Sequence, residues 1–190
     1  MLAASLSAAP GTGGRVIALV PVGDVPAGEL SPLLPVLRET FGADVVIAAA
    51  VPLPPAAYDA RRRQHLSTAL LEVLARARRP GWDRLLGVAD VDLFVPELNF
   101  VFGEGDPDRG VAVFSLRRLR AGGNEAGTEL FARRAATEAV HELGHSYGLG
   151  HCRDPYCAMW FSNSLAETDR KGTRLCPAHA AELRRLTAKP

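Results

Sequence analysis

The chain has 190 residues, of which 47% are hydrophobic, and this length supports one packed domain rather than two. Its 22 basic and 21 acidic residues give a formal net charge of +1, so no global charge attracts nucleic acid or an anionic membrane. No apolar run reaches the roughly 18 residues of a membrane-spanning helix. We therefore expect a single domain without a nucleic-acid or membrane partner, and we favour a monomer.

Residues 1–14 are small and apolar but lack the basic start of a secretory signal peptide. We interpret them as a flexible tail before a domain that spans residues 15–190. The three cysteines are an odd number and cannot form a closed set of disulfides. A reducing compartment with metal-bound thiolates suits them better, so the expected location is the cytoplasm.

Runs of uncharged, often β-branched residues predict the strands. The first run, over 15–22, is apolar throughout after its first residue, which predicts burial on both faces. Further strands are predicted over 44–51, 84–88, 100–102 and 111–116. The turn-rich segment from Gly103 to Gly110 predicts an antiparallel hairpin between the last two.

Helices are predicted between and after these strands. The first starts with Ser31 as N-cap and Pro32 as first residue, continues to Phe41 and is stopped by Gly42. An amphipathic helix is predicted over 61–79, and the polar C-terminal part ends in a helix after Cys176-Pro177. Strands that alternate with helices predict an α/β fold with a mixed, mostly parallel sheet.

The longest helix is predicted over 128–147. Phe131, Ala135, Ala139 and Leu143 recur every four residues and form its core-facing stripe. Two histidines project from a different strip of the same helix. The helix is therefore expected to anchor on the sheet and to present polar groups to a cleft.

This helix carries the motif H-E-x-x-H-x-x-G-x-x-H, which runs from His141 to His151. His141 and His145 are four residues apart, so they share one face and can bind the same ion. Gly148 can adopt a positive φ, which lets the chain leave the helix and bring His151 back to that ion. Three imidazoles with one open position are the ligand set of a catalytic zinc, and Glu142 is placed beside it as a general base.

A second pattern follows the motif and consists of Cys152, Cys157, Met159, Cys176 and His179. With the histidine motif, this order resembles the metzincin metallopeptidases and, among them, the archaemetzincins. Three upstream segments are also similar to that family: Asp92-Leu93-Phe94, Asn99-Phe100-Val101-Phe102-Gly103 and Ser115-Leu116. The resemblance covers the chain from about residue 15 onward, and it implies that Met159 lies in the turn beneath the catalytic metal.

The resemblance also implies a structural zinc held by Cys152, Cys157, Cys176 and His179. The family usually closes this site with C-x-x-C, whereas this chain has Cys176-Pro177-Ala178-His179. Three thiolates and one imidazole are an ordinary closed zinc set. The alternative is that His179 is an exposed helix residue and the second site is incomplete.

Two zinc ions per chain are therefore expected, one catalytic and one structural. The domain is expected to divide into an N-terminal subdomain, 15–148, and a C-terminal subdomain, 149–190, that contains the structural zinc. A small loop-rich region of this kind needs a metal to hold it together.

The expected reaction is hydrolysis of a peptide or protein substrate by zinc-activated water, with Glu142 moving the proton to the leaving amine. The resemblance implies peptidase activity, in some members of an aminopeptidase type on short peptides. Tyr147 or Tyr156 is a candidate to hydrogen-bond the tetrahedral intermediate, and either is equally a packing residue. Asp169 matches an acidic family position, but we interpret it as solvated or helix-capping and assign it no catalytic role.

Three alternatives stay open. The first is a zinc-binding interaction module of metzincin fold with little or no turnover, although the intact Glu142 argues against it. The second is nucleic-acid binding by the cysteine cluster with the arginines of 117–120 and 133–134, which the neutral net charge disfavours. The third is a redox protein, which the lack of a C-x-x-C pair disfavours.

Overall fold

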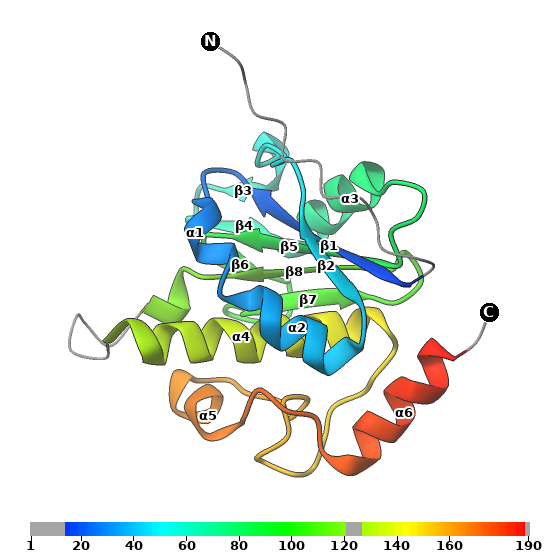
Figure 1. Ribbon diagram of the computed structural model, residues 1–190. Coiled ribbons are helices and arrows are strands. Elements are labelled where there is room, and N and C mark those ends of the chain that lie inside the picture. The colour runs from blue at the N-terminus through cyan, green and yellow to red at the C-terminus, as the bar shows by residue number, and fades with distance from the viewer. Residues whose placement is uncertain (1–13, 121–126, 189–190) are drawn as a thin grey trace.

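The computed structural model describes residues 14–120 and 127–188, which fold into layers around a central sheet (Figure 1). The sheet has five strands in the order β2-β1-β5-β8-β7. Their bounds are β1 Val16–Val22, β2 Asp44–Ile47, β5 Arg84–Ala89, β7 Gly103–Asp106 and β8 Val111–Ser115. The first four strands in this order pair in parallel, and β7 pairs antiparallel with β8. The predicted α/β fold with a mixed, mostly parallel sheet is confirmed.

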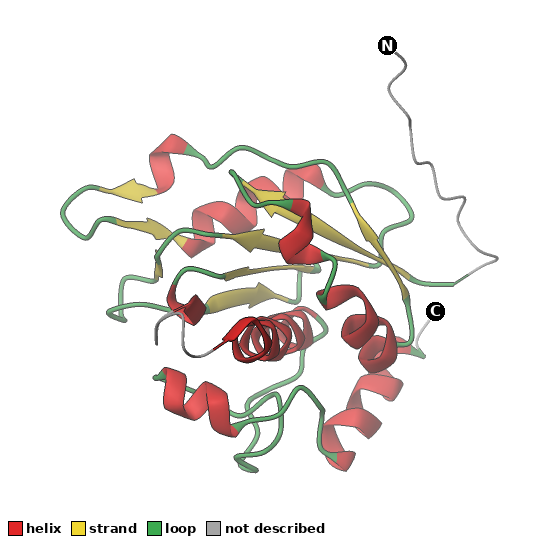
Figure 2. Cartoon of the chain, turned by 60° about the vertical axis from the view of Figure 1, so that its left-hand side comes forward, coloured by secondary structure: helices red, strands yellow, loops and turns green. Residues whose placement is uncertain are grey.

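Helices cover both faces of this sheet (Figures 1 and 2). Their bounds are α1 Ala27–Leu30, α2 Leu33–Phe41, α3 Ser67–Ala77, α4 Gly127–Ser146, α5 Leu165–Arg170 and α6 Pro177–Thr187. Alternate residues of β1 serve two cores, because Ile17 and Leu19 pack with α2 and α4 while Ala18 and Val20 pack with α3. Burial on both faces explains why this strand lacks charge, as the sequence predicts.

A second, smaller sheet lies beside the main one and was not predicted. It consists of β3 Tyr58–Asp59, β4 Gln64–Leu66 and β6 Leu93–Phe94. The prediction of a helix over 61–79 is therefore wrong at its start. The Asp59 carboxylate accepts hydrogen bonds from the backbone N–H groups of Arg61 and Arg62, and Arg63 adopts a φ of 54°. These contacts fold a hairpin turn, so α3 begins only at Ser67.

Other predicted boundaries need smaller corrections. Ser31 does not cap α2, because its hydroxyl donates to the carbonyl of Ala27 in the short helix α1. The strand predicted over 44–51 ends at Ile47, after which Val51 forms only an isolated bridge. The strand predicted over 100–102 begins instead at Gly103, but its antiparallel hairpin with β8 forms as predicted. Short 3-10 helices lie at η1 Pro55–Ala57 and η2 Arg118–Arg120.

The C-terminal part packs beneath α4, on the side away from the sheet (Figure 2). The predicted last helix is present as α6, with Pro177 in its first turn. Residues 1–13 of the predicted tail lie outside the described residues, and the division into two subdomains stays a prediction. Among the helices in the described ranges, none is both long and apolar enough to cross a membrane.

Candidate active site

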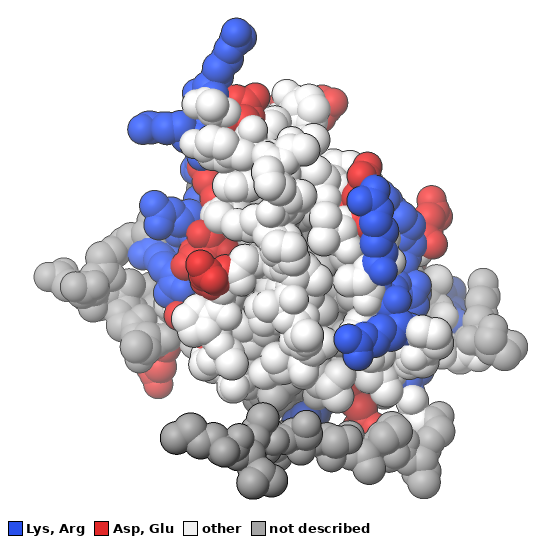
Figure 3. All heavy atoms as spheres, turned by 90° about the horizontal axis from the view of Figure 1, so that it is seen from above, with Lys and Arg blue, Asp and Glu red and all other residues white. Residues whose placement is uncertain are grey.

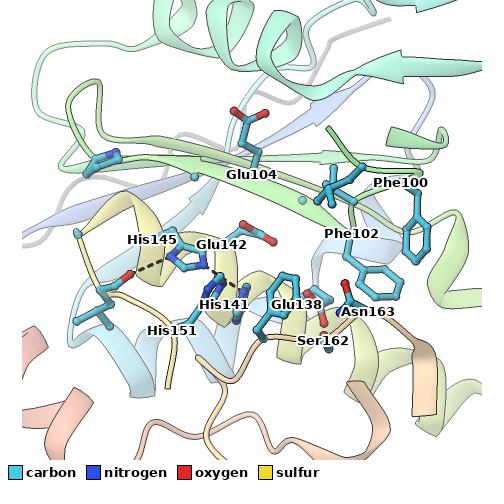
Figure 4. A pocket seen from close by; sticks show the side chains of 18 residues that line it. Phe100, Phe102, Glu104, Glu138, His141, Glu142, His145, His151, Ser162 and Asn163 are labelled. Carbon is cyan, nitrogen blue, oxygen red and sulfur yellow. Dashed lines mark hydrogen bonds between the residues drawn. The ribbon is translucent and has the colours of Figure 1, made fainter. Parts of the chain in front are cut away.

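The rings of His141, His145 and His151 converge where α4 ends (Figure 4). The Nε2 atoms of His141 and His145 lie 3.1 Å apart, and one nitrogen from each of the three rings lies within 4.8 Å of the others. Ligand nitrogens about 2 Å from a tetrahedral zinc lie about 3.3 Å from one another. The three side chains thus fit a single zinc ion, as the motif predicts, although their binding of zinc stays a prediction.

Backbone carbonyls orient the first two rings. Nδ1 of His141 lies 2.7 Å from the carbonyl oxygen of Ala158, and Nδ1 of His145 lies 2.8 Å from that of Leu149. A carbonyl only accepts, so each Nδ1 carries the hydrogen and each Nε2 offers its lone pair. Burial lowers the pKa of His141 well below its usual value and that of His145 to about 4. Both rings are therefore neutral at physiological pH, which is the form that binds metal.

Gly148 makes the turn that delivers the third ring. The helix ends at Ser146, and Gly148 has a φ of 92°, a conformation that favours glycine. The chain then reverses, and the ring centroid of His151 comes to lie 4.8 Å from that of His145. The positive φ expected from the motif is present.

Met159 is fully buried and lies against α4 at Gly144, between His141 and His145 in the sequence. A Cβ atom on Gly144 would lie 2.5 Å from the Met159 sulfur, so the glycine in the middle of the motif makes room for this contact. The neighbouring Ala158 holds His141 through its carbonyl. The segment around Met159 therefore packs against the middle of the motif and orients one candidate ligand, while its place beneath the metal stays a prediction.

Glu142 lies beside the three rings and is buried (Figure 4). Its side chain packs against β7 at Gly103, where a Cβ atom would lie 2.5 Å from the Glu142 Cγ. Burial raises the pKa of Glu142 well above its ordinary value, Glu138 and Glu104 raise it further, and Lys171 opposes them. A carboxyl group whose pKa lies closer to neutral pH can both accept a proton and return it during a reaction.

A second glycine of β7 lets α4 lie against the strand. A Cβ atom on Gly105 would lie 2.5 Å from the Cβ of His145 and 2.8 Å from the carbonyl oxygen of Glu142. We expect Gly105→Ala to push the helix away and to lower the free energy of unfolding by about 1–3 kcal/mol, measured by urea denaturation. Gly28→Ala is the control, since no atom lies within 4 Å of its Cβ position. Equal stability of the two variants would contradict this close packing.

A pocket of about 410 Å³ opens beside Glu142 and the three histidines. Its apolar walls come from Leu98, Phe100, Val101, Phe102 and Phe161, and Glu138, Ser162 and Asn163 add polar groups. Phe100, Phe102, Ser162 and Asn163 lie at one end, and the histidines lie at the other (Figure 4). The ring of Phe161 contacts that of His151, with centroids 4.9 Å apart. The carboxylate of Glu104 points away from the histidines and accepts hydrogen bonds from Ser67 and Thr68 of α3.

A buried ion pair beneath the pocket was not predicted. Lys171 and Glu138 have side chains only 0% and 1% exposed, and Nζ lies 3.1 Å from Oε1. Thr168 also donates to this carboxylate, and Lys171 donates to the carbonyl of Trp160. The only sequence signal was that Lys171 is one of two lysines in an otherwise arginine-based chain. The pair fixes the C-terminal part to α4 one turn before Glu142.

The second predicted ligand set also comes together, with one donor atom from each residue within 4.8 Å of the others. The sulfur atoms of Cys152 and Cys176 lie 3.8 Å apart. Nδ1 of His179 lies 3.3 Å from the sulfur of Cys176 and 4.0 Å from the sulfur of Cys157. Two thiolates about 2.3 Å from a tetrahedral zinc are separated by about 3.8 Å. Backbone N–H groups of Asp154 and Cys176 donate to two of the sulfurs. The four residues fit a closed zinc site, and His179 faces the thiols rather than solvent.

Neither candidate tyrosine lines the pocket. Tyr147 is buried and donates to the Asp83 carboxylate at 2.6 Å, and Tyr156 is 66% exposed. The structure thus favours a packing role for Tyr147. Asp169 binds Arg134 through both carboxylate oxygens, at 2.6 and 2.7 Å, which agrees with a structural rather than a catalytic role.

The sequence profile of peptidase family M54 matches residues 42–185. The archaemetzincin of Pyrococcus furiosus is 40% identical over 169 residues, which cover 85% of this chain and 88% of that protein. The crystal structure of archaemetzincin from Methanopyrus kandleri superposes with a TM-score of 0.84 at 35% identity and covers 94% of this chain and 99% of its own. A zinc-dependent peptidase from Methanocorpusculum labreanum has a TM-score of 0.76 at 28% identity, with coverages of 88% and 99%.

Proposed function

Because the chain belongs to peptidase family M54 and is a zinc metallopeptidase, we propose that it cleaves peptide bonds at the pocket beside His141, His145 and His151, with Glu142 as general base. The observation that carries this proposal is the convergence of three imidazoles on one point, to which His141 and His145 turn their Nε2 atoms. When bound there, zinc supplies the Lewis acidity that acidifies water and polarises a carbonyl.

Glu142 is the residue that moves the proton. Its carboxylate accepts a proton from the attacking water and donates it to the leaving amine. Packing against Gly103 fixes the carboxylate beside the rings, so little reorganisation is needed during the reaction. The other carboxylates of the pocket are engaged, Glu104 by Ser67 and Thr68, and Glu138 by Lys171.

The substrate is proposed to bind as an extended peptide along β7. This strand is one of the two edge strands of the five-stranded sheet, and its residues 103–105 line the pocket. A peptide can add to such an edge through backbone hydrogen bonds. The aromatic wall formed by Phe100, Phe102 and Phe161 favours an apolar side chain next to the cleaved bond.

A narrower proposal, an aminopeptidase that acts on short peptides, comes from the family resemblance. It gains no further support from the pocket. A carboxylate that binds the amino group of a substrate must be free, but Glu104 is hydrogen-bonded to Ser67 and Glu138 is paired with Lys171. Cleavage of N-acetylated peptides as fast as free ones would favour endopeptidase action over it.

We further propose that Cys152, Cys157, Cys176 and His179 hold a structural zinc. The catalytic set leaves one position open, whereas this set is closed by protein ligands. Elemental analysis is therefore expected to give two zinc ions per chain. Mild chelation should remove one ion together with activity, and zinc addition should restore both. One ion per chain, or loss of both ions at the same chelator concentration, would contradict this proposal.

Nucleic-acid binding receives little support from the charges. Of the arginines considered for it, Arg118 pairs with Asp92, Arg120 with Glu29 and Asp90, and Arg134 with Asp169. On the face seen in Figure 3, basic groups lie along two sides with acidic groups among them, and an uncharged band separates them. We therefore propose a peptidase without a nucleic-acid partner. A monomer remains our expectation from the sequence. A zinc-binding interaction module is the outcome if the intact protein binds both ions but cleaves no peptide.

A further inference from the structure

The two candidate metal sites meet at three consecutive residues, Gly150, His151 and Cys152. His151 faces the pocket, and Cys152 belongs to the thiol cluster. His179, in the first turn of α6, contacts this segment from the other side. Both nitrogens of its ring have partners. The other three members of the cluster are cysteines, which offer a single sulfur atom each.

The contact with Gly150 decides which nitrogen of His179 carries the hydrogen. Nε2 lies 3.1 Å from the carbonyl oxygen of Gly150, which can only accept. Nε2 is therefore the donor, and Nδ1 has the lone pair. This lone pair faces the thiols, since Nδ1 lies 3.3 Å from the sulfur of Cys176. One ring thus offers a metal ligand on one side and a hydrogen-bond donor on the other.

His151 is the candidate catalytic ligand that lacks its own orienting partner. The rings of His141 and His145 each donate to a backbone carbonyl, but within residues 14–120 and 127–188 no hydrogen bond reaches the ring of His151. Its ring is exposed and contacts Phe161, with centroids 4.9 Å apart. The position of His151 must therefore be set through its backbone.

That backbone is held on both sides. After His151, the N–H of Cys152 donates to the carbonyl of Met159 at 2.9 Å. Before it, Gly150 is exposed, and no atom lies within 4 Å of its Cβ position, so packing contributes little there. The Leu149 carbonyl, one residue earlier, accepts from His145. The Gly150 carbonyl belongs to the peptide bond with His151, and His179 is the side chain that donates to it.

We propose that His179 is a positioning residue that links the two metal centres: Nδ1 binds the structural zinc, and Nε2–H holds Gly150 so that His151 reaches the catalytic zinc. A cysteine at this position would serve as a ligand equally well but has no second group to donate to Gly150. The proposal rests on the proposed function, because it assumes that each cluster binds zinc.

The test is His179→Cys, with His179→Asp as a second replacement that offers a ligand without a donor toward Gly150. Zinc content is measured by elemental analysis, and the affinity of the exchangeable zinc is measured by chelator competition. Both variants are expected to keep the structural zinc and to bind the exchangeable zinc about 10–100-fold more weakly than the parent. Backbone amide exchange of residues 149–152 is expected to accelerate in the same variants.

His65→Cys is the matched control, since it adds a thiol in the small sheet, outside both clusters. It should leave the affinity of the exchangeable zinc unchanged. An affinity within twofold of the parent, in either His179 variant that retains the structural zinc, overturns the linking role. Failure of the parent protein to bind an exchangeable zinc would instead refute the proposed function, so the two failures are distinct.

Discussion

Replacement of Glu142 by glutamine is expected to slow peptide hydrolysis by a factor of about 10²–10⁴, while both zinc ions stay bound. Glutamine has nearly the same shape, so it can occupy the buried space against Gly103, but it cannot accept the proton from water. The measurement is kcat/KM on a peptide library, together with zinc content and thermal stability.

Glu129→Gln is the matched control, because Glu129 lies exposed in the first turn of the same helix. It makes the same chemical change away from the pocket and should leave kcat/KM unchanged. Hydrolysis by the Glu142 variant at the parental rate would exclude this residue as the general base. Loss of zinc from that variant would mean that the carboxylate supports the metal site rather than proton transfer.

Replacement of Lys171 by methionine is expected to lower the free energy of unfolding by about 3–5 kcal/mol. The substitution leaves the charge of Glu138 buried without its partner, and both side chains are at most 1% exposed. The free energy of unfolding is measured by urea denaturation at pH 7 with zinc present, so that the metal content is the same for each variant.

A double variant separates the ion pair from simple packing. Lys171→Met with Glu138→Leu removes both charges and should recover most of the lost stability, because a buried pair contributes little more than apolar residues of similar size. Arg174→Met, which changes an exposed cation nearby, is expected to have little effect. Equal loss in the single and the double variant would show that the charge of Glu138 is not what destabilises the single variant.

Local patterns in the sequence were sufficient for the main sheet and for the long helix. The apolar runs of β1, β5 and β8 reflect burial on both faces, and each run is visible within its own stretch of sequence. The spacing of the histidines and the position of Gly148 describe one helix and its end, so they predict which rings meet. Prediction succeeded where a structural element is determined by the pattern of residues that are close together in the sequence.

One local turn and two contacts between distant residues were not predicted. At Asp59 the carboxylate accepts hydrogen bonds from two backbone N–H groups, and this contact forms a hairpin turn where a helix was predicted. The arginines of this stretch suit a helix as well as a turn. The pairing of Lys171 with Glu138 depends on how the C-terminal part packs under α4. The contact of His179 with Gly150 likewise exists only once α6 lies beside the turn after Gly148. These last two are tertiary contacts without a local sequence signature.

Three imidazoles are proposed to share one zinc ion that keeps a position free for water. An anomalous difference map of the zinc-loaded crystal, recorded at the zinc absorption edge, tests this proposal most directly. A peak is expected at bonding distance from Nε2 of His141 and His145 and from the ring of His151, with no fourth protein ligand. A peak bound by a fourth protein group, or none between these rings, would contradict it.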